Sequence, residues 1–173
     1  GGAVFARGGR MTVVNARFFR NQCDATGPDL GGAGMRTIGM SGASPVYVAN
    51  STFGGADGYG NQCSNGGGMS ALWASLNVTN TLISHNKAIG VGANPQRAGT
   101  PGGGSGGAIY QDGLTFDLSV CGSLVQNNTA NEGGGAIFFV SNDFSGTMSI
   151  DRSTLSGNPN AGFETQGLPG IFI

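Results

Sequence analysis

The nine acidic residues are the side chains of this sequence best suited to chemistry, because carboxylates bind Ca²⁺ and act as acids or bases on sugars. Hydrolysis of a glycosidic bond requires two or three of them within reach of one sugar bond. The sequence contains no Asp-Asp or Asp-x-Asp pair. Asp24, Asp29 and Asp57 lie in two loop-like segments and could meet in space, but we interpret them as solvated loop residues. We therefore expect no catalytic residue, no cofactor and no metal ligand.

His85 and Lys87 are the only histidine and the only lysine. A histidine beside a cation could act as a base at neutral pH. Both residues lie where a strand is expected to end, so we interpret them as part of a solvated turn.

Two other groups of residues could bind glycans. Trp73 and Tyr59 are the aromatic residues best suited to stack on a sugar. Four arginines lie close together in the first part of the chain. They could bind an anionic glycan, or they could keep an exposed edge of the fold soluble. They are Arg7, Arg10, Arg17 and Arg20.

Composition excludes several classes of protein. The net charge of −1 and the single lysine leave no basic stripe for nucleic acid. No apolar run is long enough for a transmembrane helix. Glycine makes up 35 of the 173 residues, without the strict period of collagen. At this glycine content, internal repeats are the pattern to test.

A Gly-Gly phrase followed by apolar residues recurs along the whole chain. It begins at Gly1, Gly31, Gly67, Gly106 and Gly134, with a degraded copy at Pro169. Apolar residues that follow it are expected to be core positions, including Phe5, Tyr110, Phe138 and Phe139.

A second phrase of nine residues lies between the copies of the first. Its sixth position predicts a stacked apolar core column of Phe18, Phe53, Ile83, Leu124 and Leu155. Its ninth position predicts a ladder of stacked amides at Asn21, Asn86, Asn127 and Asn158. The five phrases start between 30 and 41 residues apart. Such variation suits short strands joined by loops, not helical repeats.

These features predict an all-β fold, a parallel β-helix of about five coils with long loop insertions and uncapped ends. Strands are expected at 4–5, 11–14, 46–48, 76–78, 108–110, 136–140 and 148–150. Residues 1–173 would form a single segment of a longer solenoid. Residues 87–105, rich in glycine and proline, would form a flexible inserted loop.

The alternation of a Gly-Gly-Ala phrase with Phe18-Phe19-Arg20-Asn21 resembles the repeat of polymorphic outer-membrane proteins, a family of autotransporter adhesins. Relaxed copies of the second motif span Ile83 to Asn86, Leu124 to Asn127 and Leu155 to Asn158. The resemblance implies a right-handed parallel β-helix and an adhesive role.

Cysteine spacing predicts one disulfide bond. The tripeptide Asn21-Gln22-Cys23 returns as Asn61-Gln62-Cys63, so that Cys23 and Cys63 would stack in neighbouring coils. Coils spaced by about 4.8 Å bring such cysteines within bonding range. Cys121 would stay a free thiol. In a secretory protein, Asn50 and Asn77 are candidate glycosylation sites.

The function that these features favour is a structural or adhesive element of an extracellular or cell-surface rod. Its partners would be further coils of the same chain, stacking subunits and glycans, with no nucleic acid and no transmembrane segment. The alternative is a fragment of a β-helix enzyme acting on polysaccharides, such as a lyase, hydrolase or epimerase, or a carbohydrate-binding β-helix. An ice-binding solenoid fits less well, because the threonines form no regular array.

Overall fold

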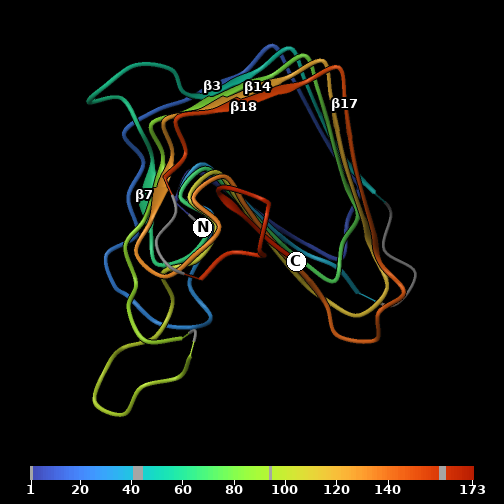
Figure 1. Cartoon of the computed structure of the whole chain (residues 1–173). Coiled ribbons are helices and arrows are strands. Elements are labelled where there is room, and N and C mark those ends of the chain that lie inside the picture. Colours follow the sequence, from blue (N-terminus) through green and yellow to red (C-terminus); the bar gives the residue numbers. More distant parts are fainter. Residues whose placement is uncertain (1, 41–44, 94, 160–162) are drawn as a thin grey trace.

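The computed structural model describes residues 2–40, 45–93, 95–159 and 163–173. Across these ranges the chain forms strands, turns and loops, and none of them contains a helix that could cross a membrane. The strands wind into about five stacked turns of a parallel β-solenoid, which confirms the expected fold class (Figure 1).

Each turn contributes strands to parallel sheets that run along the solenoid axis, which we name sheets A to D. Sheet A contains β1 (Val4–Arg7), β4 (Met35–Ile38), β8 (Met69–Leu72), β12 (Ile109–Gly113), β16 (Ile137–Ser141) and β19 (Ile171–Phe172). Sheet B contains β2 (Met11–Val14), β5 (Val46–Ala49), β9 (Leu76–Thr79), β13 (Asp117–Cys121) and β17 (Thr147–Asp151). Sheet C contains β3 (Arg17–Phe18), β6 (Thr52–Gly54), β10 (Leu82–Ser84), β14 (Leu124–Gln126) and β18 (Thr154–Ser156). Sheet D contains β7 (Gln62–Cys63), β11 (Lys87–Ala88) and β15 (Thr129–Ala130).

The core consists of columns of identical or similar side chains, one from each turn. In sheet A, Met35, Met69, Ile109 and Ile137 are fully buried in register. Sheets B and C add columns of valine, leucine and phenylalanine. Each such side chain contributes about 1.5–3 kcal/mol when its neighbours cover it. Every strand expected from the sequence is present, because these alternating apolar residues are what the stacking requires.

One predicted core position is wrong. Val125 pairs with Ile83 and Leu155 and is fully buried, whereas Leu124 lies beside it on the outer face of sheet C. Leu124 and Val125 are both apolar, so residue type alone does not show which of them belongs to the core column. The register of β14 places Val125 inward, so the core column is Phe18, Phe53, Ile83, Val125 and Leu155.

The asparagine ladder is present, with two changes in membership. Asn127 is wrong: it adopts a left-handed turn conformation with φ of 54°, and the ladder residue is its neighbour Asn128. Asn61 also belongs to the ladder, because residues 55–60 loop out before it. Amide-to-amide hydrogen bonds of 2.8–3.0 Å therefore connect the full series Asn21, Asn61, Asn86, Asn128 and Asn158.

A second ladder, of hydroxyl groups, lies between sheets B and C. In successive turns, Ser51, Thr81, Ser123 and Ser153 each accept a hydrogen bond from a backbone N–H of the preceding turn. The sequence pattern did not reveal this ladder, because serine and threonine are common in every loop of the chain.

The Gly-Gly phrases lie where the chain turns into sheet A. In some turns, the strand that follows the phrase is shifted by one residue from the alignment expected from the sequence. Met35 and Met69 pair with Ile109 and Ile137, so these residues point inward. The expected core positions Tyr110 and Phe138 consequently face outward, as does Phe5, which is 56% exposed. Phe139 does belong to the core.

Gly107 shows why a side chain is excluded at this turn. A Cβ atom there would lie 2.3 Å from the carbonyl oxygen of Gly135 and 2.5 Å from that of Thr129. We expect Gly107→Ala to lower the free energy of unfolding by about 1–3 kcal/mol, because rigid backbone must move. Urea denaturation would measure this. Gly9→Ala is the control, since a Cβ at Gly9 meets no atom within 4 Å; equal stability of the two variants would contradict the prediction.

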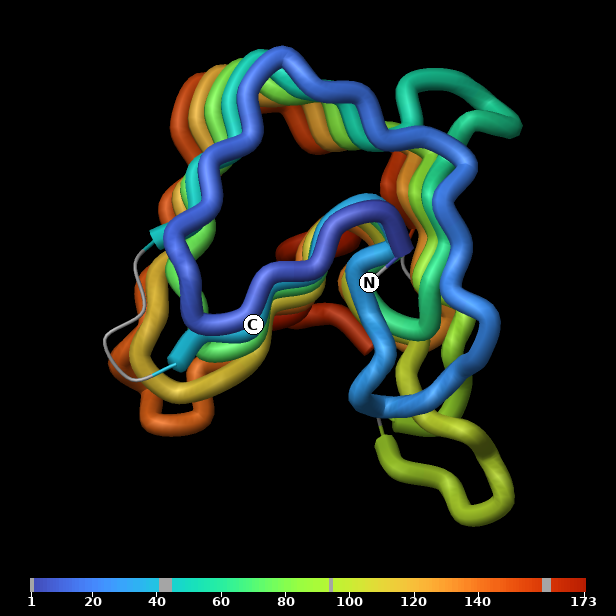
Figure 2. The backbone as a smooth tube through the Cα atoms, turned by 180° about the vertical axis from the view of Figure 1, so that it is seen from behind, coloured from blue at the N-terminus to red at the C-terminus, as the bar shows by residue number. Residues whose placement is uncertain are grey.

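Two loops extend outward from the stacked turns (Figures 1 and 2). One, drawn in teal, spans residues 55–60. The other, drawn in yellow-green, is the insertion expected at 87–105, but its first two residues form β11 and pair with β7 and β15. Val91 and Gly102 form an antiparallel bridge at its base. Arg97 in this loop forms an ion pair with the buried side chain of Glu132.

Cys23 and Cys63 form a disulfide bond between the first and second turns, with Cα atoms 4.9 Å apart. That separation matches the spacing of neighbouring turns on which the prediction was based. Cys121 is a free thiol on the outer face of sheet B.

Candidate functional site: a groove over sheet A

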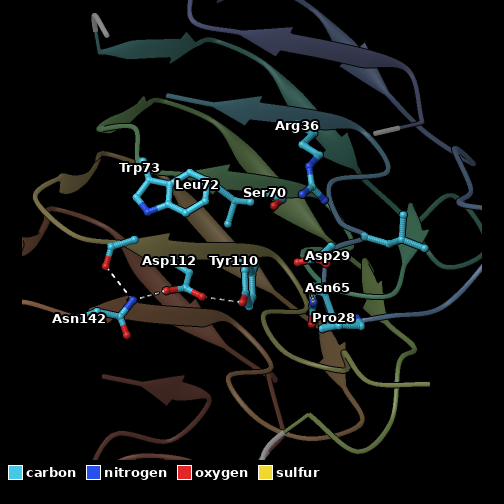
Figure 3. A pocket seen from close by; sticks show the side chains of 12 residues that line it. Pro28, Asp29, Arg36, Asn65, Ser70, Leu72, Trp73, Tyr110, Asp112 and Asn142 are labelled. Atoms are coloured by element: carbon cyan, nitrogen blue, oxygen red, sulfur yellow. Dashed lines mark hydrogen bonds between the residues drawn. The ribbon is translucent and has the colours of Figure 1, made fainter. Parts of the chain in front are cut away.

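A groove of about 250 Å³ lies on the outer face of sheet A. In Figure 2, sheet A bends inward, so that each turn is indented between this sheet and the segment that follows sheet D. Pro28, Asp29 and Leu30 form one wall of the groove. The polar and aromatic residues of its floor come from different turns (Figure 3): Arg36, Ser70, Trp73, Tyr110, Asp112 and Asn142.

Strand register brings these floor residues together. Arg36, Ser70 and Tyr110 are directly paired across β4, β8 and β12, so they form one outward-facing row. Leu72 and Asp112 form the next outward row. Residues far apart in the sequence thus converge because a parallel solenoid repeats the same position in each turn.

Trp73 follows β8 in a left-handed conformation, with φ of 51°, and its side chain is 53% exposed. Gly113 of the next turn lies against it, since a Cβ atom at Gly113 would be 2.5 Å from Trp73 Cδ1. Glycine at this position leaves room for the indole ring beside the groove.

The carboxylate of Asp112 is held in place by two neighbours (Figure 3). The Tyr110 hydroxyl donates to its Oδ2 atom at 3.0 Å, and Asn142 Nδ2 donates to its Oδ1 atom at 2.9 Å. Burial, followed by the charge and hydrogen bond of Asp112, raises the pKa of Tyr110 far above its usual value. The phenol therefore stays protonated and remains a donor, while Asp112 keeps lone pairs for a ligand.

Arg36 and Ser70 bring polar groups with no hydrogen-bond partner to the same floor. Arg36 is only 7% exposed, and its guanidinium donates to no described residue. Burial lowers its pKa, an effect that the nearby Asp29 and Tyr110 oppose. Ser70 is only 1% exposed, and its hydroxyl likewise makes no hydrogen bond.

The three acids considered from the sequence do not gather at one place. Asp29 lies in the wall of the groove over sheet A, whereas Asp57 lines a separate groove outside sheet D. Among the described residues, no group of three or more His, Cys, Asp or Glu side chains could hold a metal ion.

His85 and Lys87 do lie together, in the groove outside sheet D with Asp57 and Arg20. His85 Nδ1 is 2.5 Å from the hydroxyl of Ser84. The ring of Tyr59 is already covered by a side chain of the protein, because the Arg20 guanidinium lies 4.2 Å from the centre of the ring. Of the two aromatic candidates for a sugar, Trp73 is therefore the one left open.

The arginines of the first turn do not form a row. Arg7 faces outward from sheet A and Arg17 from sheet C, while Arg20 turns toward the loop at 55–60 and donates to Gly58 O. The arginine of the groove that sequence inspection missed is Arg36. Exact register of the Gly-Gly phrases would have placed it in one column with Ser70 and Tyr110.

In comparisons with known proteins, no family, no curated protein and no solved structure matches the chain. Function is therefore inferred from the groove over sheet A and from the repeat itself.

Proposed function

We propose that this chain is an adhesive element of an extracellular β-solenoid and that it binds saccharides in the groove over sheet A. The observation that carries this proposal is the half-exposed Trp73 beside the anchored carboxylate of Asp112. A sugar ring has an apolar C–H face and a rim of hydroxyls. An aromatic face next to a few fixed polar groups is complementary to both.

The length of the groove suits a polymeric ligand. Its floor runs from Arg36 in β4 to Asn142 after β16, which lie in turns two to five. At about 4.8 Å per turn, this path is roughly 14 Å long. Its volume is below the roughly 300–1,000 Å³ of pockets that enclose a whole small ligand. A chain that crosses the turns would therefore fit better than a single enclosed molecule.

Two further features favour an extracellular adhesive. The Cys23–Cys63 disulfide is typical of proteins from oxidising compartments. The alternation of Gly-Gly-Ala and Phe-x-x-Asn phrases resembles that of the autotransporter adhesins. The proposed role includes stacking on further coils or subunits, as solenoid repeats do.

Binding of neutral and acidic oligosaccharides to the purified chain, measured by calorimetry, tests the proposal. We expect Trp73→Ala to weaken binding at least tenfold, because a central aromatic contact is worth more than about 1.4 kcal/mol. Tyr47→Ala is a matched control, since Tyr47 is 50% exposed on sheet B, away from the groove. Equal losses in both variants, or no binding by the parent chain, would refute the proposed site.

A second candidate is a polysaccharide-cleaving enzyme, because Asp29 and Asp112 line the same groove. Hydrolysis needs two carboxyl groups on either side of the bond. Release of reducing ends by the parent chain, abolished in Asp29→Asn and in Asp112→Asn, would favour this candidate. We favour binding because the Asp112 carboxylate accepts hydrogen bonds from Tyr110 and Asn142, which suit it to accept hydrogen bonds from a ligand and not to donate a proton.

A further inference from the structure

Arg36 is a buried cation without a partner. It lies in the middle of β4 and faces the groove over sheet A. Only 7% of its surface is exposed, yet its guanidinium forms no hydrogen bond and no ion pair with any described residue. Buried arginines are normally paired, because an isolated charge loses its hydration without compensation.

Arg97 in the same chain shows the usual arrangement. Its guanidinium donates to both carboxylate oxygens of Glu132, a side chain that is 4% exposed. The fold places the Glu132 carboxylate beside the guanidinium of Arg97. The guanidinium of Arg36 has no such carboxylate bound to it and faces the groove. A guanidinium is complementary to a planar carboxylate, which it binds through two parallel hydrogen bonds.

Ser70 is the second unpartnered group at this place. It pairs directly with Arg36 across β4 and β8, and its hydroxyl has no hydrogen-bond partner. The two side chains face outward one turn apart, about 4.8 Å along the solenoid axis. Figure 3 shows the guanidinium pointing into the groove, toward Asp29.

We propose that Arg36, assisted by Ser70, binds the carboxylate of an acidic sugar residue, so that the ligand of the groove is a carboxylated saccharide. This inference rests on the proposed saccharide function and names its ligand class. Trp73 and Asp112 would hold the sugar ring and its hydroxyls, while Arg36 would distinguish the acidic residue from a neutral one.

Asp29 opposes this binding. It lies in the wall of the groove, and its negative charge attracts the guanidinium and acts to raise the pKa of Arg36. Asp29 is exposed, so solvent and salt screen its charge, whereas a carboxylate bound at Arg36 would be largely desolvated. Removing the Asp29 charge should therefore strengthen binding of an acidic ligand.

Calorimetry with three probes separates the contributions: an oligogalacturonate, its methyl ester and the matching neutral galacto-oligosaccharide. The parent chain is expected to bind the oligogalacturonate at least tenfold more tightly than the other two. Arg36→Gln is expected to remove this preference, so that the acidic and neutral probes bind with similar affinity. Asp29→Asn is expected to increase affinity for the acidic probe severalfold. A sialylated oligosaccharide, tested in parallel, distinguishes uronate from other carboxylated sugars.

Arg7→Gln is the matched control, because Arg7 is an exposed arginine on the outer face of the same sheet, outside the groove lining. Thermal unfolding of each variant checks that the fold is retained. If the parent chain binds neutral and acidic probes equally, or if Arg36→Gln keeps the preference, the role of Arg36 is refuted while saccharide binding stands. If no probe binds, the proposed function itself fails.

Discussion

Replacing Asn86 by alanine is expected to lower the free energy of unfolding by about 3–5 kcal/mol. Asn86 is fully buried in the middle of the asparagine ladder. Its Oδ1 atom accepts from the N–H and the Nδ2 of Asn61, at 3.0 and 2.8 Å. Its Nδ2 atom donates to Phe53 O and to Asn128 Oδ1, at 3.0 and 2.9 Å.

The size of the expected effect comes from the groups left behind. Truncation at Asn86 removes a partner from Asn61, Phe53 and Asn128, all of them within the solenoid. A buried polar group without its partner costs about 1–3 kcal/mol, and truncation leaves several such groups in the interior. Coupled amides also polarise one another, so a central member matters more than a terminal one.

Urea denaturation of Asn86→Ala and of a control, Asn77→Ala, would measure this effect. Asn77 lies on the outer face of β9, where its side chain bonds to no described residue. Its removal should change stability by less than about 0.5 kcal/mol. If the two variants were equally stable, the ladder would contribute nothing to folding.

The fold could be predicted because a stacked solenoid makes the same demand on each turn. Phe18, Phe53 and Ile83 recur at one position since each covers the next. The cysteine pairing could be predicted for the same reason, as Asn-Gln-Cys occurs at equivalent places in two turns.

Register within a turn was harder to predict where neighbours share a residue type. Leu124 and Val125 are both apolar, and Asn127 and Asn128 are identical. Residue type therefore cannot separate the inward member of each pair from the outward one. The backbone decides: Asn127 occupies the left-handed turn at which His85 occurs one turn earlier, and Asn128 then points inward to Asn86.

The groove could not be predicted from motifs, because no short segment contains it. Arg36 and Asp112 meet only through the pairing of β4, β8 and β12. Its wall at Pro28 to Leu30 comes from a loop of the first turn. Tyr110 lies in one row with Phe5 and Phe138, as the phrase predicts, but this row faces outward and not into the core.

The two ladders and the groove occupy different parts of the solenoid. Ladder side chains point into the solenoid, whereas Trp73, Asp112 and Arg36 lie on the outer face of sheet A. Substitutions in the groove should therefore change binding and leave unfolding largely unaffected. This separation is what allows the binding experiments to be interpreted without a loss of fold.

Removing the Cys23–Cys63 disulfide is expected to lower the free energy of unfolding by about 4 kcal/mol. The bond closes a loop of 40 residues, and the chain-entropy estimate for such a loop is about 4 kcal/mol. It also links the first turn covalently to the second. The first turn depends on this link because its core residues Met11 and Val13 are only partly buried. Because each turn contacts only its neighbours, loss of the bond should loosen this turn before the others.

Urea denaturation of the double variant Cys23→Ser and Cys63→Ser, with amide hydrogen exchange, tests both parts of this prediction. Exchange should accelerate most in β1 and β2, and much less in β9 and β13, which lie between other turns. Cys121→Ser is the control, because Cys121 is a free, partly exposed thiol whose loss should leave stability nearly unchanged. Three titratable thiols in native protein would show that the bond does not form. Uniform exchange across all sheets would instead show that the solenoid unfolds as one unit, in which case the first turn depends on the whole core and not on its own covalent link.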